Sequence, residues 1–222
     1  MPDSDAARAI ALSEYDSLRS EINNRTTLAY TLISLELAAV GAGLSVITKL
    51  PDVLLGLAAA SCFLWLFWVD HAGAVYKLAS YIALELAPKL STGAGEPVLA
   101  WEHFLRRINK NRETARAALY GPDATDQPAY IQSTTAADRY TMLLFGGSPP
   151  IFIVGYLVTI LEREHHRSTV VIWLSAAAVA LLWLFALWRF LGFRRMVENL
   201  GTAILARGEP TPSPPRPDDP SA

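Results

Sequence analysis

The sequence predicts an all-α integral membrane protein with four transmembrane helices. Four long apolar runs occupy residues 27–48, 53–69, 140–161 and 169–191. Each run is close to the roughly 20 residues that a helix needs to cross the hydrocarbon core of a bilayer. Only the first run contains an acidic residue, and the Lys and Arg residues fall almost entirely on one side of the four runs. The chain is therefore expected to work in a lipid bilayer.

The basic residues predict the orientation of the spans. Of the 19 Lys and Arg residues, three precede the first run, eight lie between the second and third runs, and five lie at or after the end of the fourth. Because positively charged loops resist translocation, both termini and residues 70–139 are expected in the cytoplasm. Acidic residues precede the first run, which is the wrong charge for a secretory signal, so this run is expected to be a retained span.

The first two spans are predicted to continue into the cytoplasm, the first of them through residues 1–26. Residues 5–40 contain no Pro or Gly, so one helix should run from the cytoplasm into the first span. The second helix should begin near Pro51 and be stopped by Pro88, which makes it about 54 Å long against a core of about 30 Å. Roughly 20 Å of it should therefore project into the cytoplasm as one half of an antiparallel helical stalk.

Matching apolar stripes predict how the two projecting helices pair. Spacings of three and four residues place each stripe on one helix face. An antiparallel hairpin aligns the stripes in order, as Ile22 with Val75, Leu18 with Leu78, Tyr15 with Ile82, and Ala11 with Leu86. The same register brings two pairs of opposite charge together, Arg25 with Asp70 and Glu21 with Lys77.

The segment between the second and third spans and the segment after the fourth span are predicted to be cytosolic. Residues 90–98 are rich in Gly, Ser and Pro and are expected to form a loop. A third cytosolic helix should follow over residues 100–119, and its basic part, residues 101–116, suits either binding to anionic lipid or capping of the stalk. Residues 192–222 are expected to form a cytosolic end with a disordered Pro-rich tail.

Glu36 lies close to the middle of the first span. An ionisable group at this depth costs about 2.5 to 3.5 kcal/mol on insertion scales, so it should face the bundle, be protonated or line water. The hairpin register places it opposite Ser61 and beside Cys62, the only cysteine of the chain. A structural carboxyl group and one that acts in ion or proton passage both remain open.

The third span contains a predicted hinge formed by Gly146, Gly147, Pro149 and Pro150. The two prolines remove backbone donors, which leaves the carbonyls of Phe145 and Gly146 without their usual helical partners. The predicted intramembrane polar residues are Glu36, Ser61 and Ser148. We expect a protonated Glu36 to donate to Ser61 or to one of the freed carbonyls.

Three motifs are distinctive: Tyr15-x-x-Leu18-Arg19-x-Glu21-Ile22-x-x-Arg25, Ala79-Ser80-Tyr81-Ile82-x-x-Glu85-Leu86, and Trp101-Glu102. They resemble a widespread set of uncharacterised bacterial four-span membrane proteins, which implies the plasma (inner) membrane of a bacterium. The layout of helices is also similar to that of SLATT-type membrane effectors of bacterial conflict systems, which implies pore formation. From the residues alone, the first motif suits a rigid stalk, and the candidate recognition surface is Tyr81, Glu85, Trp101 and Glu102.

The sequence predicts no enzyme, cofactor, metal or nucleic-acid partner. It contains no nucleophile with a base and an orienting group, no phosphate-binding Gly loop and no metal-ligand set. One remaining class is a noncatalytic membrane module that acts as a sensor, anchor or accessory protein, with a homo-oligomer or a protein partner on the cytosolic side. The other is an oligomeric pore or small transporter in which Glu36 and the kink of the third span control passage.

Overall fold

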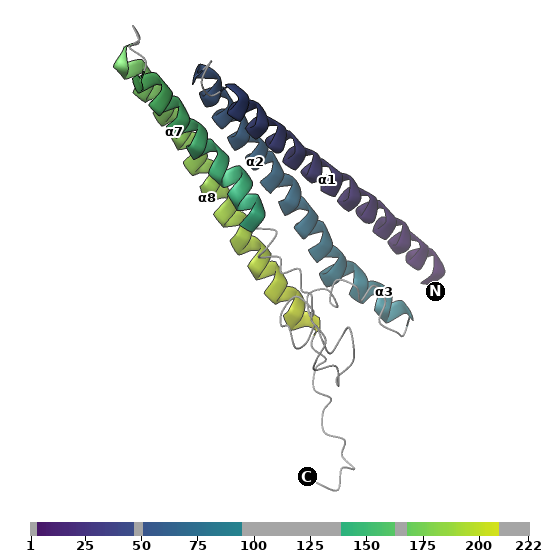
Figure 1. Ribbon diagram of the computed structural model, residues 1–222. Coiled ribbons are helices and arrows are strands. Elements are labelled where there is room, and N and C mark those ends of the chain that lie inside the picture. Colours follow the sequence, from purple (N-terminus) through teal and green to yellow (C-terminus); the bar gives the residue numbers. More distant parts are fainter. Residues whose placement is uncertain (1–3, 47–50, 95–138, 163–167, 209–222) are drawn as a thin grey trace, which may run out of the picture. The chain divides into compact units, whose positions relative to one another are not determined.

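The computed structural model describes residues 4–46, 51–94, 139–162 and 168–208 (Figure 1). The elements are α1 (Ser4–Val46), α2 (Pro51–Tyr81), the π-helix η1 (Ile82–Leu86), α3 (Ala87–Ala94), the π-helix η2 (Met142–Gly146), α7 (Gly147–Glu162) and α8 (Thr169–Gly208). Within these ranges four helices are long and apolar enough to cross a membrane, and no strand is found there. The predicted all-α class with four apolar helices is confirmed for this part of the chain.

The first apolar run and the polar segment before it form one helix, as the absence of Pro and Gly predicts. α1 has 43 residues, which corresponds to about 65 Å. A series of its buried and half-buried residues recurs every three or four positions from Ala11 to Gly43: Ala11, Tyr15, Leu18, Ile22, Arg25, Ala29, Leu32, Glu36, Ala39 and Gly43. This spacing is that of a coiled-coil seam, and the carboxyl group of Glu36 occupies a seam position.

The predicted stop of the second helix at Pro88 is wrong. The helix continues through η1 and α3 to Ala94, and residues 90–94 of the predicted loop are helical. In η1 the Ala87 N–H donates to the Ile82 carbonyl, five residues earlier, so the turn just before Pro88 is wider than an α-turn. The Pro88 ring has no N–H and would clash with the preceding turn of a regular α-helix. The wider turn gives this ring room, so Pro88 does not end the helix.

The third and fourth apolar helices differ in length. The third covers Arg139–Ile160, which is 22 residues or about 33 Å and matches one hydrocarbon core. It passes through η2 and through Pro150, which lies inside α7. α8 has 40 residues, about 60 Å, and continues to Gly208 through residues predicted only as a cytosolic end.

The described residues belong to two compact units, which we treat separately. The smaller unit contains the N-terminal end of α1, the C-terminal end of the α2–η1–α3 helix and the C-terminal end of α8, which are residues 4–15, 79–94 and 198–208. The larger unit contains residues 16–46, 51–78, 139–162 and 168–197. The four apolar runs therefore lie in the larger unit.

α2 is the common packing partner in the core of the larger unit. One cluster joins α2 to α7 and α8 through Leu54, Ala58, Phe152, Tyr156, Ile160 and Ile172. A second joins α2 to η2 and α8 through Trp65, Val69, Phe145, Ala186, Phe190 and Phe193. α1 approaches closely at Gly43, where an added Cβ would lie 2.8 Å from Phe152 Cζ and 3.2 Å from Leu57 Cδ1. Side chains of all four apolar helices therefore meet within this unit.

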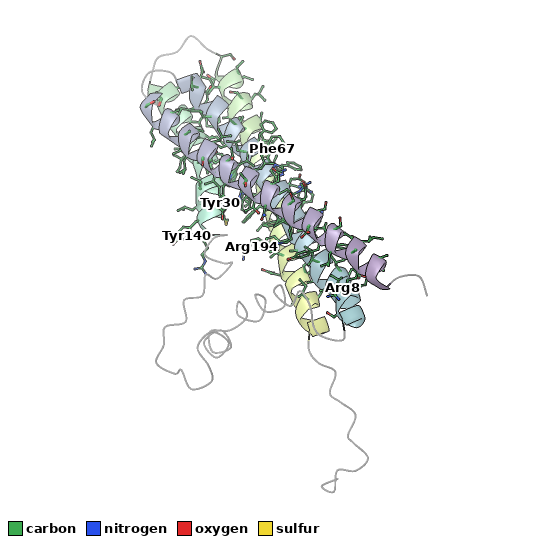
Figure 2. The ribbon with its side chains drawn as sticks, turned by 90° about the vertical axis from the view of Figure 1, so that its right-hand side faces the viewer. Arg8, Tyr30, Phe67, Tyr140 and Arg194 are labelled. Carbon is green, nitrogen blue, oxygen red and sulfur yellow. The ribbon has the colours of Figure 1, made fainter. Side chains whose placement is uncertain are left out.

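The larger unit exposes many large apolar side chains and buries several polar ones. Exposed rings include Tyr30, Phe67 and Tyr140, which Figure 2 labels. Glu36 and Ser61, in contrast, have no exposed surface. Proteins in water rarely expose so much apolar surface, whereas a hydrocarbon solvent favours this arrangement. The pattern is consistent with a multi-pass membrane protein.

Candidate functional site

Glu36 forms the centre of a buried polar site in the larger unit. Its position on the α1 seam turns the carboxyl group toward the other helices, and its exposed fraction is 0%. Burial of a carboxyl group is unfavourable unless hydrogen bonds replace its contacts with water. The hydrogen-bond partners of this carboxyl group therefore decide whether the site is purely structural or can bind a proton or an ion.

The partner of Glu36 is Ser148. The Ser148 hydroxyl donates to Glu36 Oε1, and Ser148 itself is 6% exposed. Ser148 follows Gly147 at the start of α7, so this bond joins the first span to the Gly/Pro cluster of the third. Ser148 was predicted as an intramembrane polar residue, but not as the partner of Glu36. The hairpin register could not predict this contact because it aligns only α1 with α2.

Ser61 lies next to the same carboxyl group, as the hairpin register predicts. Nevertheless, neither Ser61 Oγ nor Glu36 Oε2 has a hydrogen-bond partner among the described residues. Cys62, beside Ser61, has no exposed surface and carries a free thiol. A buried polar atom without a partner costs about 1 to 3 kcal/mol, which favours a proton or a water molecule between the two groups. The bond from a protonated Glu36 to Ser61 thus stays a prediction.

The freed carbonyl of Gly146 is used by another residue. Trp183 of α8 donates its Nε1–H to Gly146 O at 2.9 Å, which replaces the donor that Pro150 lacks. Gly146 also has little room, because an added Cβ would lie 3.2 Å from Trp65 Cη2. Glu36 Oε2 has no hydrogen-bond partner among the described residues, so the predicted donation to the Phe145 or Gly146 carbonyl is not seen there. Trp183 carried no signal in the sequence beyond its place in an apolar run.

The predicted hinge residues lie in a continuous helix. η2 ends at Gly146, Gly147 begins α7, Pro149 is fully buried and Pro150 lies inside α7. Helices often bend at a π-turn next to prolines. In this helix, however, residues at the π-turn are hydrogen-bonded to neighbouring helices. Ser148 is tied to α1 and Gly146 to α8. Motion at the hinge stays a prediction.

The predicted stalk residues are partly brought together. Ile22 is buried, and Tyr15, Leu18 and Arg19 are half-buried. The expected ion pairs of Arg25 with Asp70 and of Glu21 with Lys77 are not found among the described residues, and Arg25 Nε instead pairs with Glu21 Oε1 at 2.6 Å. These two residues are four apart on one helix and meet without reaching across to α2. Asp70 and Lys77 are both exposed.

The predicted recognition surface is described only in part. In the smaller unit the Tyr81 hydroxyl donates to Glu14 Oε1 at 2.7 Å, and the exposed fraction of Tyr81 is 37%. Glu85 is exposed. Trp101 and Glu102 lie outside the described residues, as does the basic segment 101–116 predicted to bind anionic lipid or to cap the stalk.

No protein-family model, no curated protein and no solved structure matches this chain. The resemblance to bacterial four-span proteins therefore stays a prediction, and a function must be argued from the site and the fold. No group of three or more His, Cys, Asp or Glu side chains that could hold a metal ion occurs within the described ranges.

Proposed function

We propose that the protein is a noncatalytic four-span module of a bacterial plasma (inner) membrane. Its long helices leave the bilayer on the cytosolic side as a helical stalk, with both termini in the cytoplasm. Through this stalk it acts as a sensor, anchor or accessory protein.

The helix lengths exceed what a bilayer requires. α1, the α2–η1–α3 helix and α8 are each about 60 to 65 Å long, roughly twice the hydrocarbon core. The apolar run lies at the C-terminal end of α1 and at the N-terminal ends of the other two. Four spans in succession alternate in direction, so these positions send all three extra segments to the same side of the membrane.

The single observation that carries the proposal is that the ends of these three helices gather in a compact unit of their own. Tyr81 and Glu14 are hydrogen-bonded within it, and this contact fits the predicted register that faces Tyr15 with Ile82. An isolated polar helix end would fray, whereas packed ends support a stable stalk. Such a unit offers a folded surface to a cytosolic protein partner or to a second copy of the chain.

A second candidate is an oligomeric pore or small transporter. One observation favours it: Glu36 Oε2 and the nearby Ser61 Oγ are buried without partners in the described part of the chain. Intramembrane carboxyl groups of this kind often hold a proton or a cation on a conduction path. The complete burial of Glu36 and its bond to Ser148 argue for a closed bundle in the single chain, so we prefer the module.

Membrane leakage separates the two candidates. The full chain is expressed from an inducible promoter in bacteria loaded with a membrane-potential dye, beside Glu36→Gln and the matched variant Glu21→Gln on the same helix. The module predicts an unchanged potential for all three at equal membrane abundance. Depolarisation by the wild type and by Glu21→Gln that Glu36→Gln abolishes would establish the pore and reject the module.

A further inference from the structure

A cavity of about 490 Å³ lies between α2 and α8 in the larger unit. This size is within the range of sites that bind small molecules. Its lining includes Val69 and Leu191, which end the second and fourth apolar runs. By the proposed direction of the spans, both ends face the cytosolic leaflet. The cavity is therefore expected at the depth of lipid headgroups.

The charged side chains of this cavity are predominantly cationic. Lys77, Arg189 and Arg195 line it, against one carboxylate, Asp70. All four are exposed, and no ion pair is found for any of them among the described residues. Three cations beside one carboxylate leave an excess of positive charge that attracts an anionic ligand, and Arg in particular presents a planar fork that fits phosphate oxygens.

The floor of the cavity is apolar and smooth. Gly73 and Gly192 contribute no side chain, and an added Cβ at Gly192 would meet nothing within 4 Å. Phe193 and Met196 also line the cavity, and a Cβ added at Gly73 would lie 3.8 Å from Phe193 Cδ2 and 3.7 Å from Met196 Cε. Trp188 stands at the edge with an exposed fraction of 65%, as aromatic residues do at membrane interfaces. The lining therefore offers a ligand both cations and apolar side chains.

We infer that this cavity binds an anionic phospholipid, with the phosphodiester held by Lys77, Arg189 and Arg195 and the glycerol and upper acyl chains over the apolar floor. Basic pockets between helices at the cytoplasmic face are a known place for anionic headgroups. A free phosphate would use the cations but leave the apolar floor unoccupied, so the lipid is the better fit. The inference rests on the proposed insertion and direction of the spans, which are the same for a module and for a pore.

Native mass spectrometry of the detergent-purified full chain tests the inference, with phosphatidylglycerol and phosphatidylcholine of the same acyl chains as probes. We expect phosphatidylglycerol to bind at least about tenfold more tightly. Each cation near an anionic lipid contributes about 1 kcal/mol, so Arg189→Gln and Arg195→Gln should each weaken this binding about fivefold. Arg139→Gln is the matched control, because Arg139 is an exposed cation at the start of the third apolar helix and does not line the cavity.

Asp70→Asn removes the carboxylate that opposes the ligand and should strengthen phosphatidylglycerol binding several-fold. A gain cannot arise from misfolding, so this variant keeps the test decisive even if an Arg variant loses helix content. Equal binding of the two lipids, an equal loss in Arg139→Gln, or a loss in Asp70→Asn would overturn the inference. Displacement of the lipid by millimolar inorganic phosphate would also overturn it, since the ligand would then be soluble phosphate.

Discussion

Replacing Ser148 with Ala removes the hydrogen bond that the Glu36 carboxyl group makes in the described part of the chain. Both carboxyl oxygens are then buried at 0% exposure without a partner. An unpaired buried polar group costs about 1 to 3 kcal/mol. Measured side-chain couplings within membranes average about 0.6 kcal/mol and reach about 1.7. We therefore expect Ser148→Ala to lower the free energy of unfolding by about 1 to 2 kcal/mol.

A double-mutant cycle isolates this contact. In a Glu36→Leu background the same Ser148→Ala change should cost less than about 0.5 kcal/mol, because a serine hydroxyl in a helix can donate to a carbonyl of the preceding turn. The assay is SDS titration of the detergent-purified protein, followed by tryptophan fluorescence. Ser175→Ala is the matched control, since Ser175 Oγ donates to Ile172 O of its own helix at 2.9 Å. A coupling below about 0.3 kcal/mol, or an equal loss in the control, would refute the reasoning.

Three further predictions use the same titration or hydrogen exchange. Gly43→Ala forces a Cβ against the buried Phe152 ring and should lower the free energy of unfolding by about 1 to 3 kcal/mol. Gly41→Ala adds a Cβ with no atom within 4 Å and should be neutral or stabilising. Equal effects of the two variants would exclude the close approach of α1. Trp183→Phe loses the hydrogen bond to the Gly146 carbonyl and should lower the free energy of unfolding by about 1 kcal/mol. Trp173 is exposed, so Trp173→Phe should change this free energy little. A larger loss in Trp173→Phe would contradict the assigned bond. Tyr81→Phe should accelerate amide exchange in residues 8–14, and unchanged exchange would exclude the pairing of the two helix ends.

The register of the first two helices is predicted only in part by local pattern. Stripes spaced by three and four residues aligned Tyr15 with Ile82, and the structure has Tyr81 bonded to Glu14 one position away. The same alignment placed Ser61 beside Glu36. Residues spaced by three and four lie on one helix face, so the pattern predicts which faces of the two helices meet but not each contact between them.

Contacts with the third and fourth helices could not be predicted in this way. The chain between the two hairpins is long, so no register connects Glu36 to Ser148 or Gly146 to Trp183. The sequence also did not predict that the second helix continues past Pro88. A proline inside a helix is expected to end it, but here a single π-turn before Pro88 lets the helix continue. These residues depend on tertiary packing, which residue spacing alone does not encode.

Labelling of α1 with a membrane-impermeant maleimide tests most directly the claim that this helix crosses the bilayer and continues into the cytoplasm. Ser13, Ser34 and Ser45 are all exposed on α1, and each can be changed to Cys in a Cys62→Ala background. The account predicts that Ser13→Cys reacts only in inside-out vesicles, Ser45→Cys only in right-side-out vesicles, and Ser34→Cys in neither. Reaction of Ser13→Cys and Ser45→Cys from the same side, or ready reaction of Ser34→Cys, would contradict it.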